Sequence, residues 1–191
     1  MGQPLLPLPV KLFVGMIAGD AGLFPLCRER LMTMYGPADL QSDILPWDHS
    51  SYYRKEMGTG LCRMFLFFER LFDPGALAGI KLETIRLEGE LSRSGPGGAR
   101  RTVNLDPGYI TEAKVVLATT KDFPHRIYIG DRIYAESTLH YSRSERAFIP
   151  VEHTYPDFRT PYSIELFGRA RELLRSDLQR QGSGSERRSV F

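Results

Sequence analysis

The stretch from Arg101 to Tyr141 reads RTVNLDPGYITEAKVVLATTKDFPHRIYIGDRIYAESTLHY, and it decides how we interpret the fold of this chain. Its first segment, Arg101–Leu105, has the composition of a strand. Asp106-Pro107-Gly108 follows and predicts a tight turn, because glycine supplies the positive φ of a type II geometry. The stretch places many reactive polar groups on segments that otherwise resemble protein core. This combination is typical of sites built on rigid elements.

The second half of this stretch predicts a short helix and then a hairpin. Thr111 is expected to cap a helix that runs to Thr120. Residues His125–Tyr141 alternate like paired strands, and Gly130-Asp131 between them predicts a two-residue turn. The polar segment between the helix and the hairpin lies where their ends would meet.

Outward from this stretch, the pattern predicts alternating strands and helices. The predicted elements are a central strand over Lys11–Ile17, a helix from Asp20 to Gly36, a strand over Leu61–Glu69, a helix from Asp73 to about Ser92, and a final amphipathic helix over Pro161–Leu178. This order favours an α+β fold, with a mostly antiparallel sheet and helices packed on one face. A ferredoxin-like core with an added hairpin is the topology we expect.

Length and composition predict an ordinary globular protein. A chain of 191 residues with 42% hydrophobic and 25% charged residues is expected to form one domain. We expect a Pro-rich arm over residues 1–10, a single globular domain over 11–178 and a disordered tail over 179–191. Cys27 and Cys62 lie beside apolar residues, which favours buried thiols in a reducing compartment over a disulfide.

Charge and hydropathy point away from nucleic acids and membranes. The net charge is +2, and the three arginines and one glutamate from Arg180 onward account for all of it. The remaining body is neutral, so there is no clear signal for nucleic-acid binding. No apolar stretch approaches the ~20 residues of a membrane span, and the start of the chain does not resemble a signal peptide. Cytoplasmic localisation is therefore expected.

The predicted hairpin carries the first group of candidate site residues. Its register would place His125 opposite Glu136 and Arg126 opposite Ala135, so that His125, Tyr134 and Glu136 share one face and Arg126 lies on the other. A carboxylate beside an imidazole suits general acid–base chemistry near neutral pH. The same pair is equally compatible with an ordinary cross-strand contact.

A second group of candidates surrounds the predicted turn. Asp106 is a candidate catalytic residue together with His125 and Glu136, and the candidate ligand-binding residues are Asn104, Tyr109, Lys121, Arg126 and Tyr134. Asp106 also has a purely structural explanation, because an aspartate before Pro-Gly commonly accepts a hydrogen bond from the backbone of its own turn. A metal would require Asp106, Glu136 and a histidine to come together in the fold, since no metal-binding spacing occurs. Nothing in the sequence names a metal, a cofactor or an oligomeric state.

Two further features have both a functional and a plain interpretation. Lys81 and Glu88 are seven residues apart on one helical face, where they form either a site pair against the sheet or, as we favour, a solvated face. Tyr52, Tyr53 and Glu56 form either a lid or an aromatic anchor for their loop.

Several blocks of the chain resemble a known family. KLFVGMI, YYRKEMG, IKLET, RTVNLDPGYI, VLATTKDFPHRIYIGDRIYAESTLHY and TYPDFR together resemble the domain of unknown function 4416 family. That family has no established activity, although some members carry a GTP-binding label. The chain lacks the phosphate loop G-x-x-x-x-G-K-[ST], and Phe123 stands where the GTPase base-recognition motif has an aspartate. It also has Thr84-Ile85 where the family often reads Thr-Asn.

Two classes of function fit these residues. The first is an enzyme acting on a small polar or phosphorylated molecule, with His125 and Glu136 as acid and base and with Asp106 and Lys121 as ligand contacts. The second is a non-enzymatic module that binds a nucleotide, RNA or protein through Arg126, Tyr128, Tyr109 and the tyrosine-rich loop. A cavity on which Asp106, His125 and Glu136 converge would favour the first class, and an exposed contiguous patch would favour the second.

Overall fold

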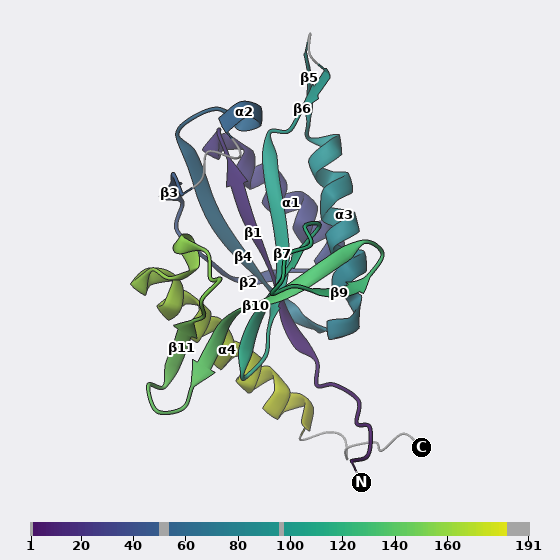
Figure 1. Ribbon diagram of the computed structural model, residues 1–191, viewed down its shortest axis with the longest axis vertical. Coiled ribbons are helices and arrows are strands. Elements are labelled where there is room, and N and C mark those ends of the chain that lie inside the picture. Colours follow the sequence, from purple (N-terminus) through teal and green to yellow (C-terminus); the bar gives the residue numbers. More distant parts are fainter. Residues whose placement is uncertain (1, 50–53, 96–97, 183–191) are drawn as a thin grey trace.

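A computed structural model describes residues 2–49, 54–95 and 98–182, and it contains a nine-stranded antiparallel sheet (Figure 1). The order of the main path is β11-β10-β8-β7-β1-β4-β2, with β3 paired to β4 and β9 paired to β10. The strands of this sheet are β1 (Val10–Ala18), β2 (Ala38–Gln41), β3 (Leu45–Trp47), β4 (Leu61–Phe72), β7 (Val103–Ile110), β8 (Lys114–Thr119), β9 (Ile127–Gly130), β10 (Ile133–Ser142) and β11 (Ala147–Pro150). The predicted α+β class with a mostly antiparallel sheet is confirmed.

Helices and a small second sheet complete the fold. The helices are α1 (Phe24–Tyr35), α2 (Arg54–Met57), α3 (Leu77–Glu90) and α4 (Pro161–Gly182), and single 3₁₀ turns precede α1, α3 and α4. Strands β5 (Arg93–Gly95) and β6 (Gly98–Arg100) form a hairpin that projects from the top of the molecule in Figure 1. None of the helices among the described residues is long and apolar enough to cross a membrane.

The central part of the sheet has the ferredoxin-like arrangement. The elements β1, α1, β2, β4, α3 and β7 follow each other as β-α-β-β-α-β, and their strands are ordered β7-β1-β4-β2. The expected ferredoxin-like core is therefore present. Strands β8, β10 and β11 extend the sheet beyond β7, and β9 adds the hairpin that the sequence predicted.

Side-chain alternation along β1 divides the core into two layers. Leu12, Val14 and Met16 belong to the cluster that includes residues of α1 and α3, whereas Phe13 packs with α4 on the opposite face. In Figure 1, α3 and α4 lie on opposite sides of β7. The expectation that all helices pack on one face is therefore wrong for α4. Every side chain of β1 is buried because both faces of this strand are covered.

The layer beneath α4 is an aromatic cluster. Phe13, Phe65, Phe67, Phe158 and Phe167 are each at most 1% exposed. Their ring centroids lie 5.1–6.4 Å apart, mostly in edge-to-face geometry. Such pairs contribute about 0.5–1.5 kcal/mol each beyond the burial of their surface. This layer fixes the positions of β1 and β4 at one side of the site described below.

The predicted Asp106-Pro107-Gly108 turn is wrong, because these residues lie inside β7. Gly108 does not have a positive φ. It is a glycine for another reason: a Cβ at this position would lie 2.4 Å from the Val116 carbonyl oxygen and 2.5 Å from Cζ of Phe13. Close approach of neighbouring segments, and not turn geometry, accounts for this glycine.

Two more local predictions are wrong in the same stretch. The segment expected to be a helix after Thr111 is strand β8, as its β-branched Val115 and Val116 favour. Thr111 caps a turn instead, and its hydroxyl accepts hydrogen bonds from the backbone of Ala113 and Lys114. The hairpin turn lies one residue later than predicted, with φ of 50° at Asp131 and 63° at Arg132. The register is consequently Tyr134 opposite Tyr128.

The predicted helix starts at Asp20 and Asp73 and the predicted stop at Gly36 are confirmed, whereas α4 continues past the predicted end at Leu178 to Gly182. Residues 179–182 of the predicted disordered tail are therefore helical, and the rest of that tail lies outside the described residues. Asp20 and Asp73 each accept a hydrogen bond from the backbone amide two residues later, at 2.9 Å and 2.7 Å. Helix α1 ends at Gly36, whose φ of 95° suits glycine. Both cysteines are free thiols, and burial raises the pKa of the Cys27 thiol to about 11.

Candidate functional site

The candidate site lies where the sheet opens between β7 and β8. These strands pair only from Gly108 to Ile110, so the first half of β7 has no strand partner on this side. Side chains of α3 replace the missing strand: the Leu105 amide donates to Oε1 of Glu88 at 2.7 Å, and the Leu105 carbonyl accepts from Nζ of Lys81 at 2.8 Å. Pro107, two residues later on the same edge, has no N–H that would need a partner. The backbone of the open edge is therefore satisfied by charged groups.

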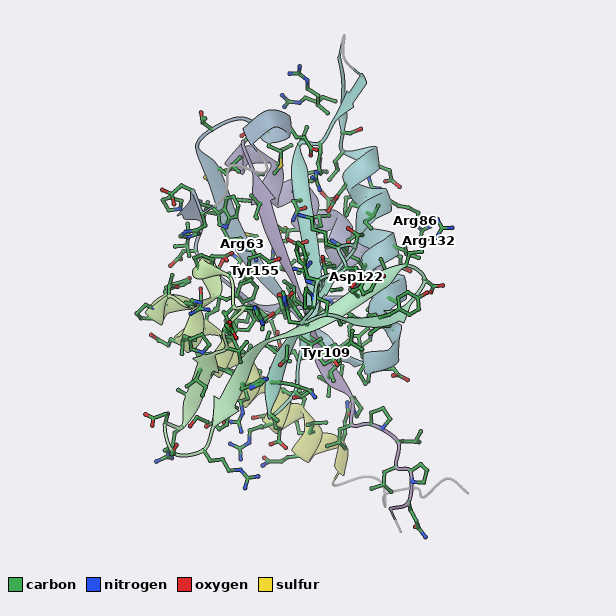
Figure 2. The ribbon with its side chains drawn as sticks, viewed as in Figure 1. Arg63, Arg86, Tyr109, Asp122, Arg132 and Tyr155 are labelled. Carbon is green, nitrogen blue, oxygen red and sulfur yellow. The ribbon has the colours of Figure 1, made fainter. Side chains whose placement is uncertain are left out.

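A cavity of about 190 Å³ occupies this opening. The lining comes from both faces of the sheet, because α3 contributes Lys81 and Glu88 while the opposite face contributes Arg63 and Tyr155. Figure 2 shows Arg63 and Tyr155 close to each other in this view. The remaining lining residues are Ile17, Trp47, His49, Ile85, Arg101, Asn104, Asp106, Leu117, Ala118, Thr119, Thr120, Lys121, Pro156, Asp157 and Phe158.

Charged and amide side chains form a continuous network along β7 at this cavity. Lys81 donates to Oδ1 of Asp106 at 3.1 Å, and the Asn104 amide donates to Oδ2 of the same carboxylate at 2.5 Å. Arg101 donates to Oδ1 of Asn104 at 3.0 Å and lies 3.5 Å from Oε2 of Glu88. The network therefore connects α3 to β7 through alternating charges. The prediction that Lys81 and Glu88 lie on a solvated face is wrong, since they are 5% and 7% exposed.

Glu88 is the titratable group of this network whose environment most favours a retained proton. Burial raises the pKa of its carboxyl group, and the nearby carboxylate of Asp106 acts in the same direction. Lys81, the Leu105 amide and Arg101 oppose this effect without cancelling it. A carboxyl group with a raised pKa beside a cavity is suited to donate a proton.

We expect the raised pKa of Glu88 to make the stability of the protein depend on pH. A folded-state pKa above the unfolded value means that the native state binds the proton more tightly, so this contribution is full below about pH 4.3. It is lost as the pH rises through the raised pKa. The free energy of unfolding of the wild type should therefore fall, relative to that of Glu88→Gln, as the pH rises from about 4.3 through the raised pKa of Glu88. Urea unfolding of both proteins from about pH 4 to pH 8 measures this difference, and a difference independent of pH would contradict the prediction.

The candidate pair His125 and Glu136 forms a second cluster, beside the cavity but not among its lining residues. Nε2 of His125 lies 3.1 Å from Oε2 of Glu136, so the predicted contact between them is present. His125 precedes β9, however, and approaches Glu136 from a loop. The predicted separation of Arg126 from this face is wrong, because Nε of Arg126 donates to the same carboxylate oxygen at 2.6 Å. The His125 ring stacks on His153 with centroids 3.9 Å apart.

Arg126 connects this cluster to the cavity. It donates to the Tyr155 hydroxyl at 2.8 Å and to the backbone carbonyl of Lys121 at 3.1 Å, and both of these residues line the cavity. Burial, followed by the charge of Glu136, raises the pKa of the Tyr155 hydroxyl. The buried Glu136 and Arg126 thus hold one wall of the cavity in place.

The other sequence candidates lie in different surroundings. Asn104, Asp106 and Lys121 line the cavity, whereas Tyr109 packs against the apolar cluster on the α3 side of β7 and Tyr134 contacts Tyr128 on the hairpin. Arg126 is 8% exposed, so it cannot form an exposed patch with Tyr128 and Tyr109. The proposed lid residues Tyr52 and Tyr53 lie outside the described residues. Glu56 pairs with Arg101 at 2.7 Å.

Metal-binding side chains do not gather at this site in the part of the chain that the structure describes. No group of three His, Cys, Asp or Glu residues there could hold a metal ion together. Asp106 lines the cavity while Glu136 and His125 form the neighbouring cluster, so the three are not brought to one point.

The cavity residues that the sequence did not indicate include Arg63, Trp47 and Asp157. Asp157 lies 3.3 Å from both Nε of Arg63 and Nε1 of Trp47, and the Arg63 side chain is 4% exposed. One signal was available, since Arg63 is a charged residue on the same strand face as Phe65 and Phe67. A charged side chain on an otherwise buried strand face is a candidate for function.

Fold and site together define an α+β protein in which an extended ferredoxin-like core holds a cavity lined by charged side chains. The chain belongs to the family described as Domain of unknown function (DUF4416), which matches residues 8–174. The resemblance inferred from the sequence is thereby confirmed. No curated protein and no solved structure is significantly similar to this chain.

Proposed function

We propose that this protein binds a small polar molecule in the cavity between β7 and β8 and performs proton-transfer chemistry on it. The observation that carries the proposal is the network of Lys81, Asp106 and Glu88 at the opening of the sheet. Buried ion pairs are costly to desolvate, and apolar side chains of similar volume commonly stabilise a fold as well or better. A cavity lined by such groups is therefore better explained by ligand recognition than by stability.

The three groups have distinct chemical capacities. Asp106 accepts hydrogen bonds and suits recognition of a ligand hydroxyl or amine. Lys81 compensates the charge of Asp106 and can stabilise negative charge that develops on the ligand. Glu88, whose pKa is raised by burial, serves as the proton donor.

In this proposal the pair His125 and Glu136 supports the site and does not touch the ligand. Glu136 fixes the guanidinium group of Arg126, which holds the Tyr155 hydroxyl and the backbone of Lys121. The sequence suggested His125 and Glu136 as acid and base. We assign the acid–base role instead to Glu88 and Asp106, because these two residues line the cavity.

A thermal-shift screen tests the proposal. Wild type and Asp106→Asn are compared against a panel of neutral, anionic and cationic polar metabolites. A ligand present at about 100 times its Kd stabilises the folded state by about 2.7 kcal/mol. For a chain of this size we expect an increase of about 5–10 °C in the wild-type Tm that is lost in Asp106→Asn.

Asp131→Asn is the matched control for this screen. Asp131 lies at the exposed tip of the hairpin, and asparagine tolerates its positive φ. This variant should respond to the ligand as the wild type does. The proposal is wrong if no compound shifts the wild type, or if a shift persists unchanged in Asp106→Asn.

A further inference from the structure

Arg63 reaches the cavity across the neighbouring strand β1. In the pairing of β1 with β4, Ile17 is opposite Arg63, and the end of the Arg63 side chain lies over Gly15, two residues along β1 on the same face. A Cβ at Gly15 would lie 2.6 Å from Nη2 and 3.0 Å from Cζ of Arg63. Glycine inside a strand commonly marks such a close approach. The sequence of β1 therefore leaves room for the guanidinium group to lie directly over the strand backbone.

The guanidinium group is buried and held in one orientation. Its Cζ lies 4.4 Å from the ring centroid of Phe65 and 5.3 Å from that of Phe158, and its side chain is 4% exposed. Stacking on two rings fixes the plane of the guanidinium group before any ligand binds. Pre-organisation of this kind lowers the entropic cost of binding.

Most hydrogen-bonding capacity of Arg63 is unused by the protein. A guanidinium group has five N–H donors, and Nε lies 3.3 Å from Asp157 without hydrogen-bond geometry. Within the ranges 2–49, 54–95 and 98–182, the structure contains no hydrogen bond donated by Arg63. A buried charge whose donors remain unpaired is costly unless a ligand supplies acceptors.

Asp157 is the counter-ion of Arg63, but none of the described carboxylates around the cavity accepts a hydrogen bond from the guanidinium group. Asp157 contacts Trp47 and Arg63, Asp106 accepts from Lys81 and Asn104, and Glu88 accepts from the Leu105 amide. Lys81 and the hydroxyl groups of Thr119 and Thr120 add donors to the same cavity. The unused donors of the Arg63 guanidinium group, together with the Lys81 ammonium and these hydroxyls, match a ligand group with three oxygens better than a carboxylate with two.

We infer that Arg63 is the anchor of an oxyanion subsite in this cavity and that the ligand carries a phosphoryl group. The inference rests on the proposed function, since it specifies that the ligand bound between β7 and β8 is an anion. The guanidinium group of Arg63 contacts two phosphoryl oxygens, and Lys81, which also contacts Asp106, donates to the third. Asp106 and Glu88 face the rest of the ligand.

Phosphate binding to the full chain tests this inference, with inorganic phosphate as the probe. Titrations are followed by ³¹P NMR and by Tm, and sodium acetate at matched ionic strength is the reference anion. Gly15→Ala displaces the guanidinium group without changing the charge of the protein. Arg63→Lys keeps the charge but removes the guanidinium group. Each variant should weaken phosphate binding roughly tenfold or more, which corresponds to about 1.4 kcal/mol.

Gly79→Ala is the control for the alanine substitution. No atom lies within 4 Å of a Cβ placed there on α3, so phosphate binding should equal that of the wild type. Should Gly15→Ala fail to fold, Arg63→Lys alone decides the outcome. Saturable binding of phosphate that is unchanged in both variants would show an adventitious ion only, and binding of acetate as strong as that of phosphate would exclude the phosphoryl assignment.

Failure of this inference is distinguishable from failure of the proposed function. If wild type binds no phosphate while a neutral compound produces a shift that Asp106→Asn abolishes, the subsite is wrong and the cavity remains a ligand site. If neither phosphate nor any panel compound binds, both are wrong.

Discussion

Replacing Gly108 with alanine is expected to lower the free energy of unfolding by about 3 kcal/mol or more. The added Cβ would lie 2.4 Å from the carbonyl oxygen of Val116 and 2.5–2.7 Å from two atoms of the Phe13 ring. Neither neighbour moves cheaply, because Val116 belongs to β8 and Phe13 lies within the aromatic cluster. The substitution therefore strains the strand pairing at the point where β7 and β8 separate. Urea unfolding of the variant and the wild type measures the change.

Gly79→Ala separates this steric effect from the general effect of replacing glycine. Gly79 lies inside α3, where a Cβ has open space, and alanine favours a helix over glycine by about 1 kcal/mol. This control should be more stable than the wild type. A loss of less than 1 kcal/mol in Gly108→Ala would mean that β7 and β8 adjust to the methyl group, and our account of this glycine would then be wrong.

Replacing Glu136 with alanine is expected to cost about 3–5 kcal/mol of stability. Glu136 and Arg126 have side chains that are 3% and 2% exposed, and they form a hydrogen bond of 2.6 Å. Removal of the carboxylate leaves a buried guanidinium group without a counter-ion. Its bonds to Tyr155 and to the Lys121 carbonyl remain, but these partners are neutral. Thermal and urea unfolding of the variant measure the loss.

Two comparisons show whether the effect comes from the unpaired charge. In Glu172→Ala the lost carboxylate is 60% exposed and pairs with Arg171 and Arg175, so the cost should stay below about 1 kcal/mol. The double variant Arg126→Met with Glu136→Gln removes both charges and should recover much of the stability lost in Glu136→Ala. A double variant as unstable as Glu136→Ala would mean that packing, and not charge, dominates at this position.

The predictions that succeeded from the sequence depend on short-range patterns. Asp20 and Asp73 mark helix starts because a carboxylate accepts from a backbone amide two residues away. The ferredoxin-like order follows from the succession of strands and helices, and the contact of His125 with Glu136 was expected from their positions in one hairpin. Three of the candidate site residues, Asn104, Asp106 and Lys121, line one cavity.

The errors have a common cause in interactions between distant segments. Pro107-Gly108 resembles a turn locally, yet the pairing of β7 with β1 keeps it extended. The helix expected after Thr111 is at odds with the β-branched Val115 and Val116, and pairing with β10 makes this segment a strand. A shift of one residue in the hairpin turn brought Arg126 to the face from which the prediction had excluded it.

The sequence by itself determined the fold class and most helix boundaries, because caps and side-chain alternation act within a few residues. Only the tertiary structure decided that β7 and β8 separate, that Lys81 and Glu88 fill the gap and that Arg63 reaches the same cavity over Gly15. Lys81 and its partner Leu105 are 24 residues apart. Contacts of this kind depend on the register of packed elements, and no local pattern encodes that register.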